Sequence, residues 1–127
     1  MNRKKILLVD DSNTILMMEK FILRNGPYEI LTATNGEEGV LKAAELMPDL
    51  ILLDVIMPKM GGFEACRLLR STRATRAIPI IMVTTRGEAA NVEAGWANGC
   101  TDYVTKPINA IELLAKVRNF LGDEVGQ

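Results

Sequence analysis

Three short apolar runs, each followed by a side chain that carries oxygen, are the clearest pattern in this chain. The runs are residues 6–9, 50–53 and 80–83, and they are followed by Asp10, Asp54 and Thr84. A β-strand covered on both faces reads as an unbroken apolar run, and parallel strands end at one edge of their sheet. Open α/β sheets bind ligands at that edge. We therefore expect four side chains to meet there: Asp10, Asp11, Asp54 and Thr84.

Segments with a helical period separate the apolar runs. In residues 37–47 and 110–121, apolar side chains recur at intervals of three and four, as in a helix that covers a sheet. Further helices are predicted at about residues 13–24, 62–73 and 88–98, the first capped by Ser12 or Asn13. The result is five strand-then-helix units.

The remaining two strands suggest the order of the sheet. Residues 28–33 mix the polar Glu29 and Thr32 with apolar side chains, and the strand at residues 103–105 is short. Both features suit the edges of a sheet. With right-handed crossovers, the order 2-1-3-4-5 satisfies this requirement. We expect one α/β domain over residues 1–122, and a polar tail or the start of a linker at residues 123–127.

Composition narrows the class of protein. The 127 residues fit one domain, and 15 Lys and Arg balance 16 Asp and Glu, so no attraction to nucleic acid or to an acidic membrane is predicted. Cys66 and Cys100 form neither a C-x-x-C pair nor a disulfide pattern, which suits reduced thiols. The first apolar run is too short for a signal peptide or a membrane span. We predict a cytoplasmic location.

The absence of histidine excludes several kinds of chemistry. The chain has no His. A Ser-His or Cys-His catalytic pair, a metal site with histidine ligands and a phosphohistidine are therefore all excluded within this chain. Any histidine in the mechanism belongs to a partner.

The three acids predict a metal site. Each alone could merely cap a helix or end a strand, but together they place like charges so close that they need compensation. A site of carboxylate oxygens suits Mg²⁺, with Mn²⁺ as a substitute. Thr84 and Lys106 add a hydroxyl and an ammonium that could hold phosphoryl oxygens, and Asp54 could then act as a nucleophile.

These residues together resemble a known family. The pair Asp10-Asp11, Asp54 followed by MPKMGG at residues 57–62, Thr84 and the pair Lys106-Pro107 occur in order. They resemble the receiver domain of two-component response regulators over essentially the whole chain. The resemblance implies a flavodoxin-like (βα)5 fold, with a sheet between two layers of helices.

The resemblance also implies roles for individual residues. Asp54 would accept a phosphoryl group from the phosphohistidine of a sensor histidine kinase or a histidine phosphotransfer domain. The chain would not be a conventional turnover enzyme, but would catalyse its own phosphorylation and autodephosphorylation. Asp11, Asp54 and the backbone carbonyl of Ile56 would bind Mg²⁺ directly, and Asp10 would act through water. Lys106 would contact the phosphoryl oxygens. The peptide bond before Pro107 would be cis.

A conformational switch is implied as well. Thr84 would move toward the phosphoryl group, and the ring of Tyr103 would turn inward to fill the space. Without the resemblance, Tyr103 could equally be an edge-strand aromatic residue. A downstream effector or output domain would bind the fourth helix, fifth strand and fifth helix, on or near which Trp96 lies. As a separate hypothesis, Ile56 and Arg86, which lie two residues beyond Asp54 and Thr84, set how readily water reaches the phosphoryl group.

Three alternatives remain at this point. An FMN carrier with the same fold is disfavoured, because Asp10 and Asp11 place negative charge where its phosphate would bind. A haloacid-dehalogenase-type phosphatase would carry its second Asp two residues after the first, whereas Ser12 stands there. The third alternative is a degenerate receiver that binds proteins independently of phosphorylation.

Overall fold

One sheet of parallel strands forms the centre of the molecule. The structure is a computed structural model and describes residues 3–85 and 89–122. Within these residues the sheet has five strands in the order β2-β1-β3-β4-β5, which confirms the predicted order. The strands are β1 (Lys4–Val9), β2 (Tyr28–Ala33), β3 (Leu50–Asp54), β4 (Ile80–Thr85) and β5 (Asp102–Lys106).

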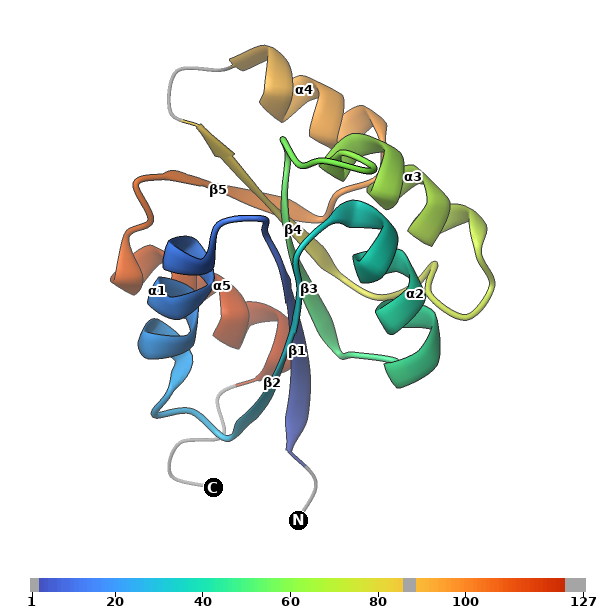
Figure 1. Cartoon of the computed structure of the whole chain (residues 1–127). Helices are drawn as coiled ribbons and strands as arrows, with labels where there is room; N and C mark the ends of the chain where they lie inside the picture. Colours follow the sequence, from blue (N-terminus) through green and yellow to red (C-terminus); the bar gives the residue numbers. More distant parts are fainter. Residues whose placement is uncertain (1–2, 86–88, 123–127) are drawn as a thin grey trace.

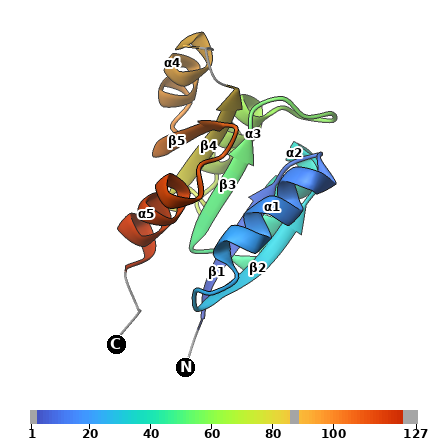
Figure 2. The same cartoon turned by 90° about the vertical axis from the view of Figure 1, so that its left-hand side faces the viewer.

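Helices cover both faces of the sheet. They are α1 (Asn13–Leu23), α2 (Gly36–Leu46), α3 (Gly62–Ser71), α4 (Ala89–Ala97) and α5 (Ala110–Leu121). Figure 1 shows α1 and α5 on one face, and α2, α3 and α4 on the other. Figure 2 looks onto α1 and α5 in front of the strands. The predicted three-layer α/β architecture is therefore confirmed.

Alternating side chains of the central strands supply a core to each layer of helices. In β1, Leu7 and Val9 pack into the cluster under α2 and α3, while Ile6 and Leu8 pack into the cluster under α1 and α5. This alternation is the two-residue period of a strand, and burial on both faces explains why the run has no polar residue. The edge strands are less buried, as their composition predicts.

The third helix is shorter than predicted. It ends at Ser71 instead of residue 73, because Thr72 is extended, with φ −103° and ψ 126°. The hydroxyls of Ser71 and Thr72 both donate to the carbonyl of Leu68, at 3.0 and 2.8 Å. Such side-chain bonds compete with the helical backbone pattern.

Some predictions fall on residues outside the described ranges. They are the start of the fourth helix at residue 88, the contribution of Arg86, and the tail at residues 123–127. Among the helices of the described residues, we find none with the length and apolar character to cross a bilayer.

Candidate functional site

The predicted site residues lie at the carboxyl edge of the sheet. Asp10 directly follows β1, and Asp54 is the last residue of β3. Thr84 lies near the end of β4, and Lys106 ends β5. The register, in which Asp54 pairs with Val83 and Thr84 with Thr105, keeps these strand ends level.

Three carboxylates come together at this edge. Asp10, Asp11 and Asp54 each offer an oxygen, and the three oxygens lie within 4.8 Å of one another. Asp10 and Asp54 are buried, and Asp11 is exposed. Burial raises the pKa of Asp10, and burial together with the charge of Asp10 raises the pKa of Asp54. The geometry therefore brings together the acids that the sequence predicted.

Lys106 balances part of this charge. Its Nζ lies 3.1 Å from Oδ1 of Asp54 and 3.6 Å from Oδ2 of Asp10. Burial alone would lower the pKa of Lys106, but hydrogen bonding and charge from Asp54 and Asp10 outweigh it, so the pKa is raised. Among the described residues, Lys106 contacts two of the three clustered carboxyl groups, those of Asp10 and Asp54. The site thus has a deficit of positive charge that a hard divalent cation with oxygen ligands fits.

The turn after β1 fixes Asp10. Its Oδ1 accepts a hydrogen bond from the N–H of Ser12 at 2.9 Å. Ser12 in turn caps α1, because its Oγ accepts from the N–H of Ile15 at 3.2 Å. Of the two predicted caps, Ser12 is the one found. Asp10 Oδ2 is left with no hydrogen bond among the described residues, and it faces Lys106.

The loop after β3 brings the start of α3 against Asp54. The N–H of Gly62 donates to the carbonyl of Val55 at 2.7 Å. A Cβ on Gly62 would lie 2.1 Å from the carbonyl oxygen of Asp54, so only glycine fits there. Lys59 and Met60 have positive φ, 62° and 142°. The same MPKMGG segment that resembles the family thus forms a close turn beside Asp54.

Thr84 places a buried hydroxyl at the same edge of the sheet. It is 2% exposed, and its Oγ1 has no hydrogen-bond partner among the described residues. A buried hydroxyl without a partner is costly, so it commonly marks a place where something else binds. The Lys106–Pro107 peptide bond on the same edge is cis, as the resemblance implies.

Tyr103 lies outside this cluster. It is half-buried in β5, and its ring meets that of Trp96 edge-on, with centroids 6.0 Å apart and an interplanar angle of 89°. Trp96 belongs to α4 and is half-exposed. The two aromatic residues thus connect β5 with α4.

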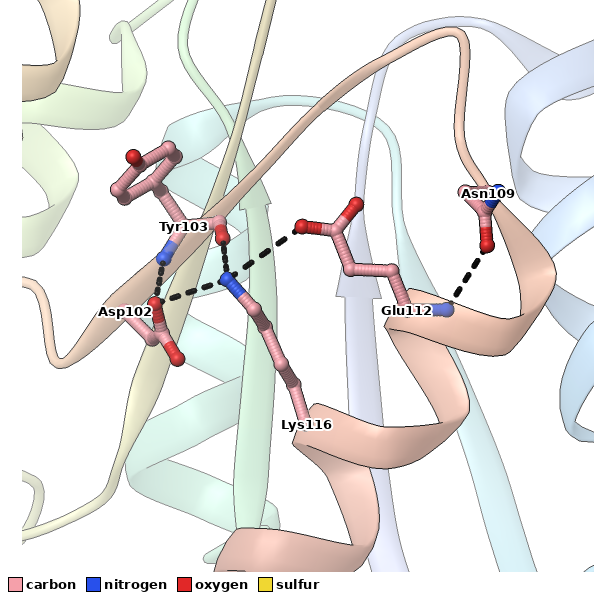
Figure 3. A network of polar contacts seen from close by, with 5 residues as sticks. All are labelled: Asp102, Tyr103, Asn109, Glu112 and Lys116. Atoms are coloured by element: carbon pink, nitrogen blue, oxygen red, sulfur yellow. Dashed lines mark hydrogen bonds and ion pairs between the residues drawn. The ribbon is translucent and has the colours of Figure 1, made fainter.

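Two further residues were not predicted from the sequence, Glu19 beside the acidic cluster and Lys116 beside Tyr103. Glu19 is 1% exposed, and its Oε1 has no hydrogen-bond partner among the described residues. Its burial could have been predicted from its spacing, because it lies three residues after Leu16 and four before Leu23, on the buried face of α1. Lys116 of α5 contacts β5 at Tyr103 (Figure 3). The sequence feature that could have pointed to Lys116 is its four-residue interval from Glu112, but such oppositely charged pairs are common on exposed helices.

Comparison with known proteins identifies curated relatives of this chain. Protein PilH of Pseudomonas aeruginosa is 38% identical over 117 residues, which are 92% of this chain and 97% of PilH. The alkaline phosphatase synthesis transcriptional regulatory protein PhoP of Bacillus subtilis is 40% identical over 118 residues, which are 93% of this chain and 48% of PhoP. The chain spans about half the length of PhoP and of the other transcriptional regulators compared.

Solved structures of similar sequence also have a similar fold. Chemotaxis protein CheY4 of Vibrio cholerae has a TM-score of 0.86 at 35% identity, covering 94% of this chain and 99% of that one. The receiver domain of a sensor histidine kinase of Pseudomonas aeruginosa PAO1, solved with magnesium in its active site cleft, has a TM-score of 0.88 at 28% identity, covering 96% and 100%. A family model described as the response regulator receiver domain matches residues 6–118. The chain therefore belongs to the receiver domains of two-component response regulators.

Proposed function

We propose that Asp54 is the residue of this receiver domain that accepts the phosphoryl group. The observation that carries the proposal is the position of Asp54, buried at the sheet edge between two other carboxylates and the ammonium of Lys106. A phosphohistidine on a sensor kinase or a phosphotransfer domain would be the donor, since this chain has no histidine. A degenerate receiver is not favoured, because the acids and Lys106 are all in place.

The proposed transfer uses the Asp54 carboxylate as nucleophile. An oxygen of Asp54 forms a bond to phosphorus while the phosphorus–nitrogen bond of the donor breaks. The bonding electron pair stays on the imidazole nitrogen, which takes up a proton from solvent. The signal would end by hydrolysis. We propose that water attacks the phosphorus, that the bond from phosphorus to the Asp54 oxygen breaks, and that inorganic phosphate leaves, which restores the carboxylate of Asp54.

The residues present fit a Mg²⁺ ion, or Mn²⁺ in its place. Asp11, Asp54 and the backbone carbonyl of Ile56 would hold it directly, and Asp10 would act through water. When bound, the ion supplies positive charge that offsets the carboxylates and the phosphoryl oxygens. Lys106, whose ammonium is already ion-paired to Asp54, would contact the phosphoryl oxygens.

The unpartnered hydroxyl of Thr84 suits a role in the response to phosphorylation. We propose that it donates to a phosphoryl oxygen and that the ring of Tyr103 moves inward in the same transition. An effector or output domain would then bind the surface of α4, β5 and α5. Trp96, which contacts Tyr103, lies on that surface.

The extent of the protein and its further partners are also proposals. We propose that residues 1–122 form the receiver and that residues 123–127 are a tail or a linker. Several relatives are named as transcriptional or DNA-binding regulators, and they give no support to the prediction that nucleic acid is not a partner. A cytoplasmic location remains a prediction.

Intact mass spectrometry tests this function. With acetyl phosphate and Mg²⁺, the protein should gain the mass of one phosphoryl group, and it should not do so when a chelator removes the metal. Asp54→Asn should give no adduct, while Glu45→Gln, an exposed change on α2, should behave as the wild type. An adduct on Asp54→Asn would mean that another residue is the acceptor.

A further inference from the structure

Lys116 joins α5 to β5 through several polar contacts. Its Nζ lies 3.1 Å from Oδ1 of Asp102 and 3.6 Å from Oε2 of Glu112, and it donates a hydrogen bond to the carbonyl of Tyr103 (Figure 3). An ammonium has three N–H donors. Three oxygens therefore surround a group with three donors, so the position of the ammonium is well defined.

The partners of Lys116 are themselves held in place. Oδ1 of Asp102 also accepts from the N–H of Tyr103 at 2.8 Å. The N–H of Glu112 donates to Oδ1 of Asn109, the cap of α5, at 2.9 Å. The network thus ties the start of α5 to the backbone of β5 on both sides of Tyr103.

Lys116 also contacts the Tyr103 ring. Its Nζ lies 5.0 Å from the ring centroid, within the range of a cation–π interaction. The edge contact with Trp96 described above adds a second neighbour to the same ring. The ring of Tyr103 is therefore placed by a cation from α5 and by an aromatic side chain from α4.

We infer that Lys116 is a positioning residue that stabilises the half-buried position of the Tyr103 ring and opposes its movement inward. On this inference, an inward rotation breaks the cation–π contact and the Trp96 contact, whereas the hydrogen bond to the Tyr103 carbonyl, which involves no side-chain atom of Tyr103, can remain. That backbone bond would act as a pivot. The position of the ring is a property of the protein before phosphorylation, but its importance for signalling rests on the function proposed above.

A matched control exists on the opposite edge of the sheet. Lys42 of α2 pairs with Glu38 at 3.1 Å and donates to the carbonyl of Thr32 in β2. It likewise links a helix to an edge strand, and no aromatic ring of the described residues contacts it. Replacing Lys42 therefore removes a comparable helix-to-strand tether and leaves Tyr103 untouched.

The test is fluorine NMR on protein labelled with 3-fluorotyrosine, with a soluble gadolinium chelate to report exposure of the ring. Tyr28 is the other tyrosine, so Tyr28→Phe identifies the Tyr103 signal. Lys116→Met should raise the ratio of inward to outward ring about two- to fivefold, as expected for one lost cation–π contact. The relaxation effect of the chelate on Tyr103 should fall accordingly.

Three further samples make the result decisive. Lys116→Arg keeps a cation near the ring and should resemble the wild type, and Lys42→Met should do so as well. Asp54→Asn combined with Lys116→Met should show the same shift as Lys116→Met alone, because phosphorylation is not involved. An unchanged Tyr103 signal in Lys116→Met, or an equal change in Lys42→Met, would overturn the inference. Failure of the phosphoacceptor proposal would instead appear as a missing mass adduct in the wild type.

Discussion

A buried carboxylic acid, Glu19, is the residue whose environment is least expected from its chemistry. It lies on the face of α1 that also carries Leu16 and Leu23. Burial raises its pKa from 4.5 to about 8, and the charges of Asp10 and Asp54 add to this while Lys106 opposes it. Near neutral pH the side chain is therefore mostly a neutral acid. A neutral group costs less to bury than a carboxylate.

Glu19 makes stability depend on pH. The unfolded chain releases this proton near pH 4.5, whereas the folded chain keeps it until about pH 8. Stability therefore falls as pH rises through this interval, and Glu19→Gln removes the loss. The variant should match the wild type near pH 4.5 and exceed it at pH 8 by a few kcal/mol, on the order set by the pKa shift. Urea denaturation at both pH values measures the difference, and a difference independent of pH would contradict the account.

Ile56 is the second residue with a specific consequence. It is 70% exposed and lies two residues after Asp54, and its apolar side chain cannot orient a water molecule for attack. Ile56→Asn adds an amide that can do so. We predict faster loss of the phosphoryl group, by about tenfold, which is less than the roughly 100-fold that a proton-transferring side chain contributes, because the amide only orients the water. Intact mass followed over time gives the rate. Leu41→Asn, at an exposed site on α2, is the control, and equal rates for Ile56→Asn and the wild type would reject the prediction.

At the scale of elements, the start of α3 depends on one close backbone approach. Gly62 leaves room for the carbonyl of Asp54, which a Cβ would meet at 2.1 Å. At Gly61 the nearest atom to an added Cβ is the carbonyl oxygen of Val55 at 3.2 Å. Gly62→Ala must therefore move α3 away from β3, while Gly61→Ala requires only a small adjustment.

This difference predicts the effects of the two substitutions. Gly62→Ala should lower the free energy of unfolding by about 2 kcal/mol or more, as in overpacked cores. It should also weaken phosphorylation, because Asp54 shifts with the loop. Gly61→Ala should cause a smaller loss of both the free energy of unfolding and the extent of phosphorylation. Thermal unfolding and the adduct yield measure these effects, and equal effects of the two variants would show that the close approach is unimportant.

Most helices and strands could be predicted, because the pattern of apolar residues within each segment determines them. The apolar runs of β1, β3 and β4 and the spacing in α5 depend only on which faces are buried. The end of α3 could not be predicted, since it depends on hydroxyl bonds from Ser71 and Thr72 that compete with the helix. Glu19 and Lys116 were missed for a related reason. Their environments are built by segments far apart in the chain, and their own spacing also fits ordinary helical positions.

At the scale of the molecule, one strand connects the acidic site to the surface of α4 and α5. Lys106 ends β5 and contacts Asp54, while Tyr103 lies three residues earlier on the same strand. Tyr103 contacts Trp96 of α4 and Lys116 of α5. Strand β5 therefore carries both a residue that contacts Asp54 and a residue that contacts the two helices. The candidate site was predictable because strand ends share an edge, whereas the side-chain contacts along β5 required the structure.

Chemical trapping of the phosphorylated residue distinguishes Asp54, the proposed phosphoacceptor, from the neighbouring carboxylates. Phosphoramidate carries a phosphorus–nitrogen bond like that of phosphohistidine, so it serves as the donor in the presence of Mg²⁺. Borohydride then reduces the acyl phosphate, and peptide mass spectrometry locates the reduced residue. We expect reduction of Asp54, dependent on both donor and metal. Reduction of Asp10, Asp11 or any other residue in its place, or no donor-dependent reduction, would contradict the proposal.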